Sequence, residues 1–316
     1  MTSTWAISFA DIEAAARRIA PLVHRTPVAT CAALDRLAGR RLFFKCEHLQ
    51  KVGAFKFRGA CNAIAALGEE AERGIVTHSS GNHAQAVALA ARLRSVQAHV
   101  VMPHDSNPKK RAAVLDYGAR VVSCELAERE AVALLVAEQT GAVLVPSYNH
   151  PDVIAGQGTA ALELLQEVPD LDAIIAPIGG GGLFAGTAIA AAHLRPGIRI
   201  FGAEPLGADD AARSFAAGHW LPQSAPRTIA DGLRTSTGTL TWPIIRDFAE
   251  AVVTVEEPEI VRAMRHAWER AKLLIEPSSA VAVAAVLGDA FRELEGIERV
   301  GIILSGGNVD LDALPW

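Results

Sequence analysis

Short apolar runs rich in β-branched residues alternate with longer amphipathic stretches from about residue 41 onward, and this alternation restricts the fold more than any other feature. The runs lack a polar alternate face, so we expect strands covered on both sides, and helical crossovers between them imply parallel pairing. The sequence therefore predicts an α/β protein with doubly wound sheets. The expected strands are Leu42–Cys46, Gly74–Ser79, Ala98–Met102, Arg120–Cys124, Val143–Ser147, Ala173–Ile178, Ile198–Glu204, Val252–Val255 and Val300–Leu304. The expected helices include Ala84–Leu93, Gly158–Glu167 and Ile260–Leu274.

Composition narrows the class of protein. The 316 residues, half of them hydrophobic, suffice for two domains, and we expect a large domain of residues 1–70 and 146–316 and a small domain of residues 71–145. The net charge of −5 disfavours nucleic acid and anionic lipid as partners. Four scattered cysteines and an amphipathic helix over Met1–Val23, in place of a signal peptide, predict a soluble, cytoplasmic protein with no membrane span.

A lysine between two phenylalanines follows a glycine-containing bend in the segment Gly53–Ala60. An apolar setting lowers the pKa of an ammonium group, which would make Lys56 available as a nucleophile and base. Taken alone, the segment favours a surface lysine that starts a helix and pairs with an acid.

A second polar segment, His78–Gln85, ends a predicted strand and opens a helix. Gly81 permits a tight turn, and the amides that follow would point toward an anion. Ser79, Asn82 and His83 are therefore candidates to hold a carboxylate. Capping of the helix also explains serine and asparagine at these positions.

Four consecutive glycines, Gly179–Gly182, stand between another predicted strand and helix, where their N–H groups can converge on one phosphate. The spacing misses the dinucleotide pattern G-x-G-x-x-G by one residue, and no Lys-Ser/Thr follows, so we expect a single phosphate monoester. After the last strand, Leu304–Asp310 places Ser305 where ligands bind in such sheets, although an ordinary Gly-Gly turn explains this segment equally well.

In this order, the four segments resemble the fold type II pyridoxal-phosphate enzymes, which share the fold of the tryptophan synthase β subunit. The resemblance is strongest to the serine racemase and serine–threonine dehydratase (threonine ammonia-lyase) family. It implies two doubly wound, mainly parallel sheets in a large cofactor-binding domain and a small domain, pyridoxal 5′-phosphate as cofactor, and a homodimer. It covers essentially the whole chain and includes His24–Pro27, Ile154–Thr159, Ala203–Pro205, Thr228–Gly232 and Ile275–Pro277.

The resemblance also implies a role for individual residues. Lys56 would carry the cofactor as a Schiff base, and Phe55 would lie against the cofactor ring. Asn82 would bond the pyridine hydroxyl, and Ser305 would face the pyridine nitrogen. A neutral hydroxyl there does not force that nitrogen to be protonated, which favours prompt elimination over a long-lived carbanion. The phosphate would be held by Gly179, Gly180, Gly181, Gly182 and Leu183, and the substrate carboxylate by Ser79, Asn82 and His83.

The expected activity is β-elimination: L-serine or L-threonine loses water and yields a keto acid and ammonia, after Lys56 removes the Cα proton. Ser80 keeps serine racemase with side elimination open, because racemases of this family use a serine here as the acid/base on the opposite cofactor face. A 3-hydroxyaspartate ammonia-lyase is a further alternative, in which His83, Arg129 or His150 would meet the second carboxylate. A catalytically silent ligand-binding relative is the non-enzyme alternative, and Lys56 argues against it.

Glu204 and Asp210 match the acidic metal ligands of this family, and the Ala208 carbonyl would complete the protein's share. Oxygen ligands suit Mg²⁺, Mn²⁺ or Ca²⁺. The alternative is that Asp209 and Asp210 only favour a helix N-terminus electrostatically. Tyr148 departs from the asparagine or phenylalanine usual at its position in relatives, which bears on the choice of substrate.

Overall fold

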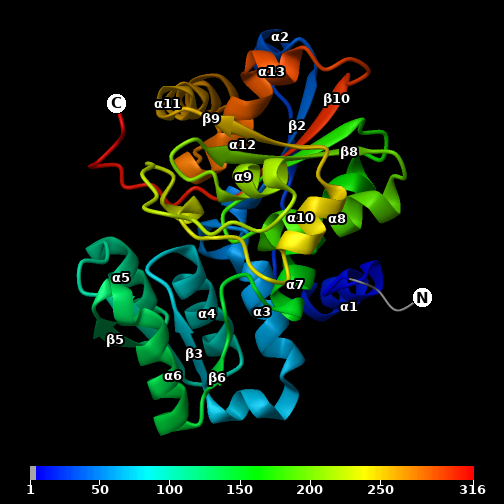
Figure 1. The fold of residues 1–316 in the computed structure, drawn as a ribbon. Coiled ribbons are helices and arrows are strands. Elements are labelled where there is room, and N and C mark those ends of the chain that lie inside the picture. The colour runs from blue at the N-terminus through cyan, green and yellow to red at the C-terminus, as the bar shows by residue number, and fades with distance from the viewer. Residues whose placement is uncertain (1–4) are drawn as a thin grey trace.

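The computed structural model describes residues 5–316 and contains two sheets, each flanked by helices (Figure 1). The six-stranded sheet has the order β1-β2-β10-β7-β8-β9, and the four-stranded sheet has the order β5-β4-β3-β6. All pairs are parallel except β1 with β2. The strands are β1 (Val28–Ala29), β2 (Arg41–Cys46), β3 (Ile75–His78), β4 (Ala98–Pro103), β5 (Arg120–Cys124), β6 (Val143–Leu144), β7 (Ala173–Pro177), β8 (Arg199–Pro205), β9 (Ala251–Val255) and β10 (Arg299–Leu304).

Helices cover both faces of each sheet. The six-stranded sheet packs against α1, α7, α8 and α10 on one face and against α2, α11, α12 and α13 on the other. The α-helices are α1 (Phe9–Ile19), α2 (Ala32–Ala38), α3 (Lys56–Ala66), α4 (Asn82–Leu93), α5 (Pro108–Asp116), α6 (Arg129–Thr140), α7 (Pro151–Glu167), α8 (Gly182–Leu194), α9 (Asp210–Ala217), α10 (Trp242–Phe248), α11 (Glu257–His266), α12 (Pro277–Leu287) and α13 (Asp289–Arg292). The predicted α/β class with two mainly parallel sheets is confirmed.

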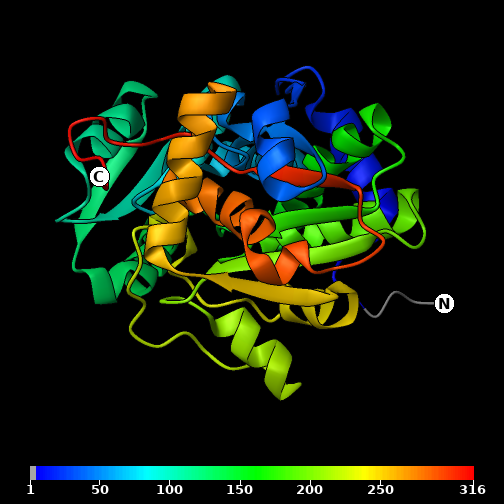
Figure 2. The same cartoon turned by 90° about the horizontal axis from the view of Figure 1, so that it is seen from above.

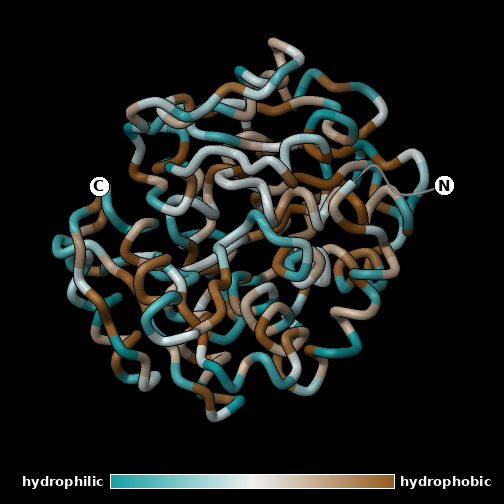
Figure 3. The backbone as a smooth tube through the Cα atoms, turned by 60° about the horizontal axis from the view of Figure 1, so that its bottom comes forward, coloured by the Kyte–Doolittle hydropathy of each residue, from teal (hydrophilic) through white to brown (hydrophobic). Residues whose placement is uncertain are grey.

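Neighbouring residues of the central strands enter opposite cores, which explains why the strands lack a polar face. Phe43 and Ile174 lie in the core with α7 and α8, whereas Phe44 and Ile175 lie in the core with α11 and α12. Successive side chains of a strand point to opposite faces, so both must be apolar when helices cover both faces. Burying each such side chain contributes about 1.5–3 kcal/mol. Apolar stretches accordingly recur through the interior of the hydropathy-coloured trace (Figure 3).

The four-stranded sheet takes all of its strands from residues 71–145. Its larger core also includes Ile19, Phe57 and Ile64 from earlier in the chain and Val153 from α7. The helix α3 therefore packs into this core while it also contacts α7. The domain boundaries at residues 70 and 146 stay a prediction.

Four elements differ by more than two residues from those expected. The helix Gly158–Glu167 begins earlier, as α7 at Pro151. The strand Val143–Ser147 is only Val143–Leu144: these two residues are in register with β3, and Val145 adds one more hydrogen bond, from its N–H to the Val76 carbonyl at 2.9 Å, before the chain leaves the sheet. The helix Ile260–Leu274 ends as α11 at His266 and continues in a π-helical turn, which Lys272 closes with a φ of 60°. The N-terminal helix is α1, capped by Ser8, and the first four residues of the expected helix lie outside the described chain. No helix within residues 5–316 has both the length and the apolar character needed to cross a bilayer.

Candidate active site

Lys56 is the first residue of α3 and follows a bend with unusual backbone angles. Val52 has a φ of 57° and Gly53 a φ of 69°. A β-branched residue disfavours this region, so contacts must hold the bend in place. One such contact is the Asn308 side-chain amide, which donates to the Val52 carbonyl at 2.7 Å.

Backbone pairing joins the lysine bend to the segment after β10. The Phe55 N–H donates to the carbonyl of Ser305 at 2.9 Å, which puts this buried serine beside the start of α3. Lys56 Nζ donates to the Ser147 carbonyl at 2.8 Å and lies 5.1 Å from the centroid of the Phe55 ring. Burial lowers the pKa of the Lys56 ammonium to about 8, so a fraction of the amine is free at neutral pH.

An ionic cluster lies beneath α3. Arg58 donates to Glu47 at 2.7 and 2.8 Å and to Glu163 at 2.8 Å through two nitrogens. Lys45 Nζ donates to Glu163 at 2.7 Å and to the Thr26 carbonyl at 2.6 Å. The two cations and Glu47 are fully buried. The cluster fixes α3 to β2 and α7 only two residues beyond Lys56. Its members were not predicted, because no spacing in the sequence relates them.

The turn between β3 and α4 carries the predicted carboxylate-binding residues. His83 is 2% exposed, and its Nε2 lies 3.2 Å from the Val145 carbonyl oxygen. Burial and the charge of Lys56 lower the pKa of His83 to about 3. Ser80 is exposed, whereas Ser79 is half-buried. Backbone N–H groups at the start of a helix favour anions, so this turn can bind a carboxylate through its amides.

Asn82 belongs to a hydrogen-bond network with the segment after β10. Its Nδ2 donates to Glu276 Oε1 at 2.8 Å, and its Oδ1 accepts from Asn308 Nδ2 at 2.9 Å. Asn308 also donates its backbone N–H to Glu276 Oε2 at 3.1 Å. Burial raises the pKa of Glu276 to about 8. One N–H of Asn82 is left for a ligand. Glu276 and Asn308 were not predicted as site residues; the matching motif Ile275–Pro277 was the one available signal.

The glycine loop packs closely against neighbouring side chains. A Cβ at Gly180 would lie 2.2 Å from Cγ of Tyr148, and a Cβ at Gly181 would lie 2.7 Å from Oγ1 of Thr241. Gly181 also has a φ of 85°, which favours glycine. The loop leads directly into the 13-residue helix α8, which starts at Gly182, so backbone N–H groups converge where the sequence predicts a phosphate. These residues fit a phosphate monoester.

The predicted metal ligands are two buried carboxylates. Glu204 accepts the backbone N–H groups of Ala211 and Ala212 at 3.1 and 2.8 Å, and Asp210 accepts that of Thr237 at 2.8 Å. Burial and then the charge of Asp210 raise the pKa of Glu204 well above its usual value. Within residues 5–316, no three His, Cys, Asp or Glu side chains are grouped as metal ligands. A site made of Glu204, Asp210 and the buried Ala208 carbonyl stays a prediction.

The end of the chain lies beside the helices of the four-stranded sheet (Figure 2), and ion pairs join α5 to this end and to Asp231. Lys109 at the start of α5 donates to Asp310 at 2.5 Å and also to Asp312. Lys110 donates to Asp231 at 2.5 Å. Since α5 follows a strand of the four-stranded sheet and the aspartates belong to the other part, these pairs hold the two parts together.

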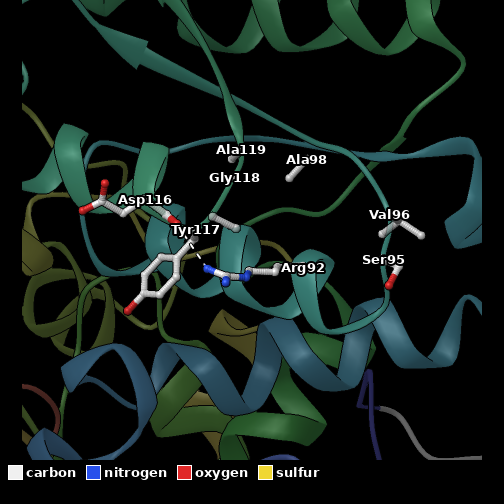
Figure 4. Close-up of a pocket in the computed structure, with 9 residues that line it drawn as sticks. Arg92, Ser95, Val96, Ala98, Asp116, Tyr117, Gly118 and Ala119 are labelled. Carbon is white, nitrogen blue, oxygen red and sulfur yellow. Dashed lines mark hydrogen bonds between the residues drawn. The ribbon is translucent and has the colours of Figure 1, made fainter.

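A hollow of about 320 Å³ lies away from these residues, at the far end of α4 (Figure 4). It is lined by Arg92, Asp116 and Tyr117 among others, and Arg92 Nη1 donates to the Asp116 carbonyl at 3.2 Å. The candidate site is at the opposite end of the same 12-residue helix, about 18 Å away at 1.5 Å per residue.

The structure therefore gathers most of the predicted site residues. Lys56 and His83 both bond to carbonyls of the segment after β6, which also carries Tyr148 against Gly180. Asn82 bonds to Asn308 in the segment after β10, and Ser305 at the start of that segment bonds to Phe55. The roles expected for these residues stay predictions.

Two residues named as cationic partners lie at the margin of this group. Arg129 is the first residue of α6. Its positive charge is among the causes that lower the pKa of His78, and it opposes the burial that raises the pKa of Tyr148. His150 Nδ1 lies 4.0 Å from Asp152 Oδ2, so a carboxylate of the chain itself already faces this ring.

Known proteins resemble the chain over nearly its full length. The family described as pyridoxal-phosphate dependent enzyme matches residues 19–306. The serine racemase of Arabidopsis thaliana is 50% identical over 316 residues, covering 98% of this chain and 96% of that protein. The structure of maize serine racemase has a TM-score of 0.96 at 49% identity and covers 98% of this chain and 95% of the maize chain. The crystal structure of a T.th. threonine deaminase has a TM-score of 0.92 at 46% identity, covering 97% of this chain and 100% of that one.

Proposed function

Since the chain belongs to the family of pyridoxal-phosphate-dependent enzymes, we propose that it interconverts L- and D-serine, with Lys56 and Ser80 as its two proton carriers. One observation supports this most directly. The exposed hydroxyl of Ser80 stands in the same turn as His83, whose pKa is lowered by burial and by the charge of Lys56. The buried amine of Lys56 and the exposed hydroxyl of Ser80 are thus both near His83. The full-length similarity to serine racemases supports racemisation as the main reaction, ahead of the elimination expected from the sequence.

The chain's own residues would do the following. The bound cofactor supplies an electron sink that makes the Cα–H bond of the substrate acidic. Lys56 would hold the cofactor covalently, and its released amine would take the Cα proton on its own face. Ser80 Oγ would return a proton on the opposite face. The amides of Gly179–Gly182 would bind the phosphate, and the free N–H of Asn82 would donate to the ring hydroxyl.

Elimination of water from L-serine or L-threonine is the second candidate. It is favoured by Ser305, a buried neutral hydroxyl at the end of β10 where a carboxylate would stabilise a long-lived carbanion. The likeness to the threonine deaminase supports it as well. We propose that elimination accompanies racemisation, and that Glu204, Asp210 and the Ala208 carbonyl bind a divalent cation.

The test uses the cofactor-reconstituted protein in D₂O with L-serine, D-serine, L-threonine and the 3-hydroxyaspartate isomers. We expect D-serine from L-serine with deuterium at Cα, measured by chiral chromatography and mass spectrometry, together with some pyruvate. Pyruvate or 2-oxobutyrate without D-serine would leave elimination as the main reaction. Oxaloacetate as the dominant product would identify the protein as a 3-hydroxyaspartate ammonia-lyase instead. A protein that no added cofactor turns yellow would support a silent binding relative.

The variant Ser80→Ala separates the two reactions. It should abolish racemisation and spare elimination from L-serine, because only racemisation needs a proton from the second face. Ser224→Ala, at an exposed loop serine, is the matched control and should retain both activities. Equal loss of both activities in Ser80→Ala would contradict this division of roles.

A further inference from the structure

The side-chain amide of Asn308 lies between two acceptors. Its Nδ2 donates to the Val52 carbonyl at 2.7 Å and to Asn82 Oδ1 at 2.9 Å. A backbone carbonyl can only accept, so the atom of Asn308 that faces Val52 must be the amide nitrogen. Because the same nitrogen faces Asn82, the atom of Asn82 that accepts from it must be Oδ1. A backbone group thus fixes the orientation of both side-chain amides.

Glu276 closes this network from the other end. The side chain is buried, and Oε1 accepts from Asn82 Nδ2 at 2.8 Å while Oε2 accepts the backbone N–H of Asn308 at 3.1 Å. Both oxygens therefore face donors, which is the arrangement that suits a carboxylate. Burial and then the charge of Asp231 raise the pKa of Glu276 to about 8, whereas Lys110 and the two hydrogen bonds oppose the rise.

The carboxyl group of Glu276 is itself held in place. Its backbone N–H donates to the Gly306 carbonyl at 3.0 Å, and a Cβ at Gly306 would lie 2.6 Å from Oε1. Glu276 also precedes the first residue of α12, and its carbonyl accepts N–H groups of that helix. The carboxylate therefore cannot follow Asn82 if this side chain turns.

One N–H of the half-buried Asn82 side chain remains after these bonds are made. An amide whose orientation is fixed offers this donor in one place and cannot replace it with an acceptor by turning over. An N–H group bonds more strongly to an ionised oxygen than to a neutral one. The network therefore prepares Asn82 for a ligand oxygen that carries negative charge.

We propose that Glu276 and Asn308 are positioning residues that fix the amide of Asn82, so that its remaining N–H meets the ring oxygen of the bound cofactor and favours the ionised form of that oxygen. This role rests on the proposed function, because Asn82 must bond the ring oxygen. The ring oxygen and the Lys56 nitrogen share one proton, so ionising the oxygen leaves the proton on the nitrogen. The form with the ionised oxygen absorbs visible light, whereas the other form absorbs in the near ultraviolet.

Glu276→Gln tests the carboxylate without changing its shape. An amide has one oxygen, so either Asn82 or the Asn308 N–H loses its acceptor. At pH 9, above the pKa of about 8 to which burial raises Glu276, the ratio of the visible to the near-ultraviolet band of the reconstituted protein should fall. We expect a fall of about ten- to a hundredfold, as for loss of a hydrogen bond to a charged group. Asp172→Asn is the matched control and should leave the ratio unchanged, since Asp172 also accepts two backbone N–H groups at 2.9 Å, but at the opposite end of β10.

A double variant separates the orientation of Asn82 from packing. Asn308→Asp alone puts an acceptor where Asn82 Oδ1 and the Val52 carbonyl need a donor, so it should lower the Tm of the cofactor-free protein. In Asn308→Asp/Glu276→Gln, Asn82 can turn over, donate to the carboxylate at position 308 and accept from the amide at position 276. This variant should recover part of the lost Tm. The visible band should stay weak, because turning over puts the Asn82 carbonyl where its N–H was.

Three results would overturn the positioning role. The first is an unchanged band ratio in Glu276→Gln, and the second is an equal fall in Asp172→Asn. The third is a double variant that regains the visible band together with its stability, or that is less stable than Asn308→Asp alone. None of these measurements needs turnover. A protein that shows the expected spectra but neither racemises nor dehydrates serine would contradict the proposed function alone, and an active protein whose spectra do not change would contradict the positioning role alone.

Discussion

Replacing Arg58 with methionine should destabilise the protein strongly. Arg58 makes four hydrogen bonds of 2.7 to 2.8 Å to Glu47 and Glu163, and neither Arg58 nor Glu47 is exposed to solvent. The intact cluster contributes little net stability because desolvating the charges offsets their attraction. Removing one partner from a buried pair costs about 3–5 kcal/mol, since a buried charge is left uncompensated.

The same figure sets the expected thermal shift. A chain of 316 residues has an unfolding entropy of about 0.7 kcal/mol/K near its midpoint, from the usual value per residue. A loss of about 3–5 kcal/mol then lowers Tm by about 4–8 °C. Urea unfolding of the cofactor-free protein, followed by circular dichroism, would give the free energy of unfolding directly.

A second substitution tests the reason for the loss. Glu47→Gln added to Arg58→Met should restore part of the stability, because it removes the carboxylate that Arg58→Met leaves without its cation. Arg292→Met is the control, since this arginine is half exposed in its ion pair with Asp289 and should cost about 1 kcal/mol or less. An Arg58→Met protein within about 1 kcal/mol of the wild type, or strictly additive losses in the double variant, would refute the reasoning.

Four further predictions follow from the site. The Lys56 pKa is lowered to about 8 from 10.5, so the unfolded chain binds more protons than the folded protein between these two pH values. The free energy of unfolding of the cofactor-free protein should therefore increase with pH across this window. Unfolding scans of Lys56→Met should show a smaller increase. Gly180→Ala should weaken cofactor binding about tenfold or more in absorbance titrations, because its Cβ would lie 2.2 Å from the Tyr148 ring. The double variant Gly180→Ala/Tyr148→Ala should recover part of the lost affinity, because it removes that ring. Mg²⁺ at about a hundred times its Kd should stabilise the protein by about 2.7 kcal/mol, and EDTA or Glu204→Gln should abolish the gain. Salt should speed hydrogen exchange in α5 of the wild type, and Lys110→Met should show a smaller salt effect.

The strands were predictable because their setting imposes a visible pattern. Residues of β7 and β10 face two apolar cores, so their runs are continuous in the sequence. The short strand β1 has only two residues and no such pattern, and it forms because Val28 and Ala29 lie antiparallel to the end of β2. The length of β6 was overestimated for a related reason: the apolar character continues to Val145, whose N–H still donates to the Val76 carbonyl, but the residues in register with β3 end at Leu144.

The parts of the candidate site that are turns at strand ends were predictable from the sequence, whereas the parts that depend on contacts between distant residues were not. Gly179–Gly182 and the turn before α4 follow strands, and glycine and polar residues at strand ends are visible in the sequence. The cluster of Arg58 with Glu163 joins positions 105 residues apart, and nothing in either segment indicates the other. The tautomer of His83 likewise depends on a carbonyl 62 residues away.

The ion pairs around the candidate site differ in burial and therefore in the free energy needed to break them. The cluster at Arg58 is buried and fixes α3, with Lys56, to β2 and α7. The pairs between the two parts are exposed: the Lys109 and Asp310 side chains are 58% and 27% exposed, and those of Lys110 and Asp231 are 18% and 47% exposed. Exposed pairs contribute about 0–1 kcal/mol each, so breaking them to separate α5 from the chain end costs little. Breaking the ion pairs between α5 and the chain end thus costs much less than breaking the buried cluster beside Lys56, and the hydrogen bonds of Asn82 to Glu276 and Asn308 join the same two parts more firmly because they are less exposed.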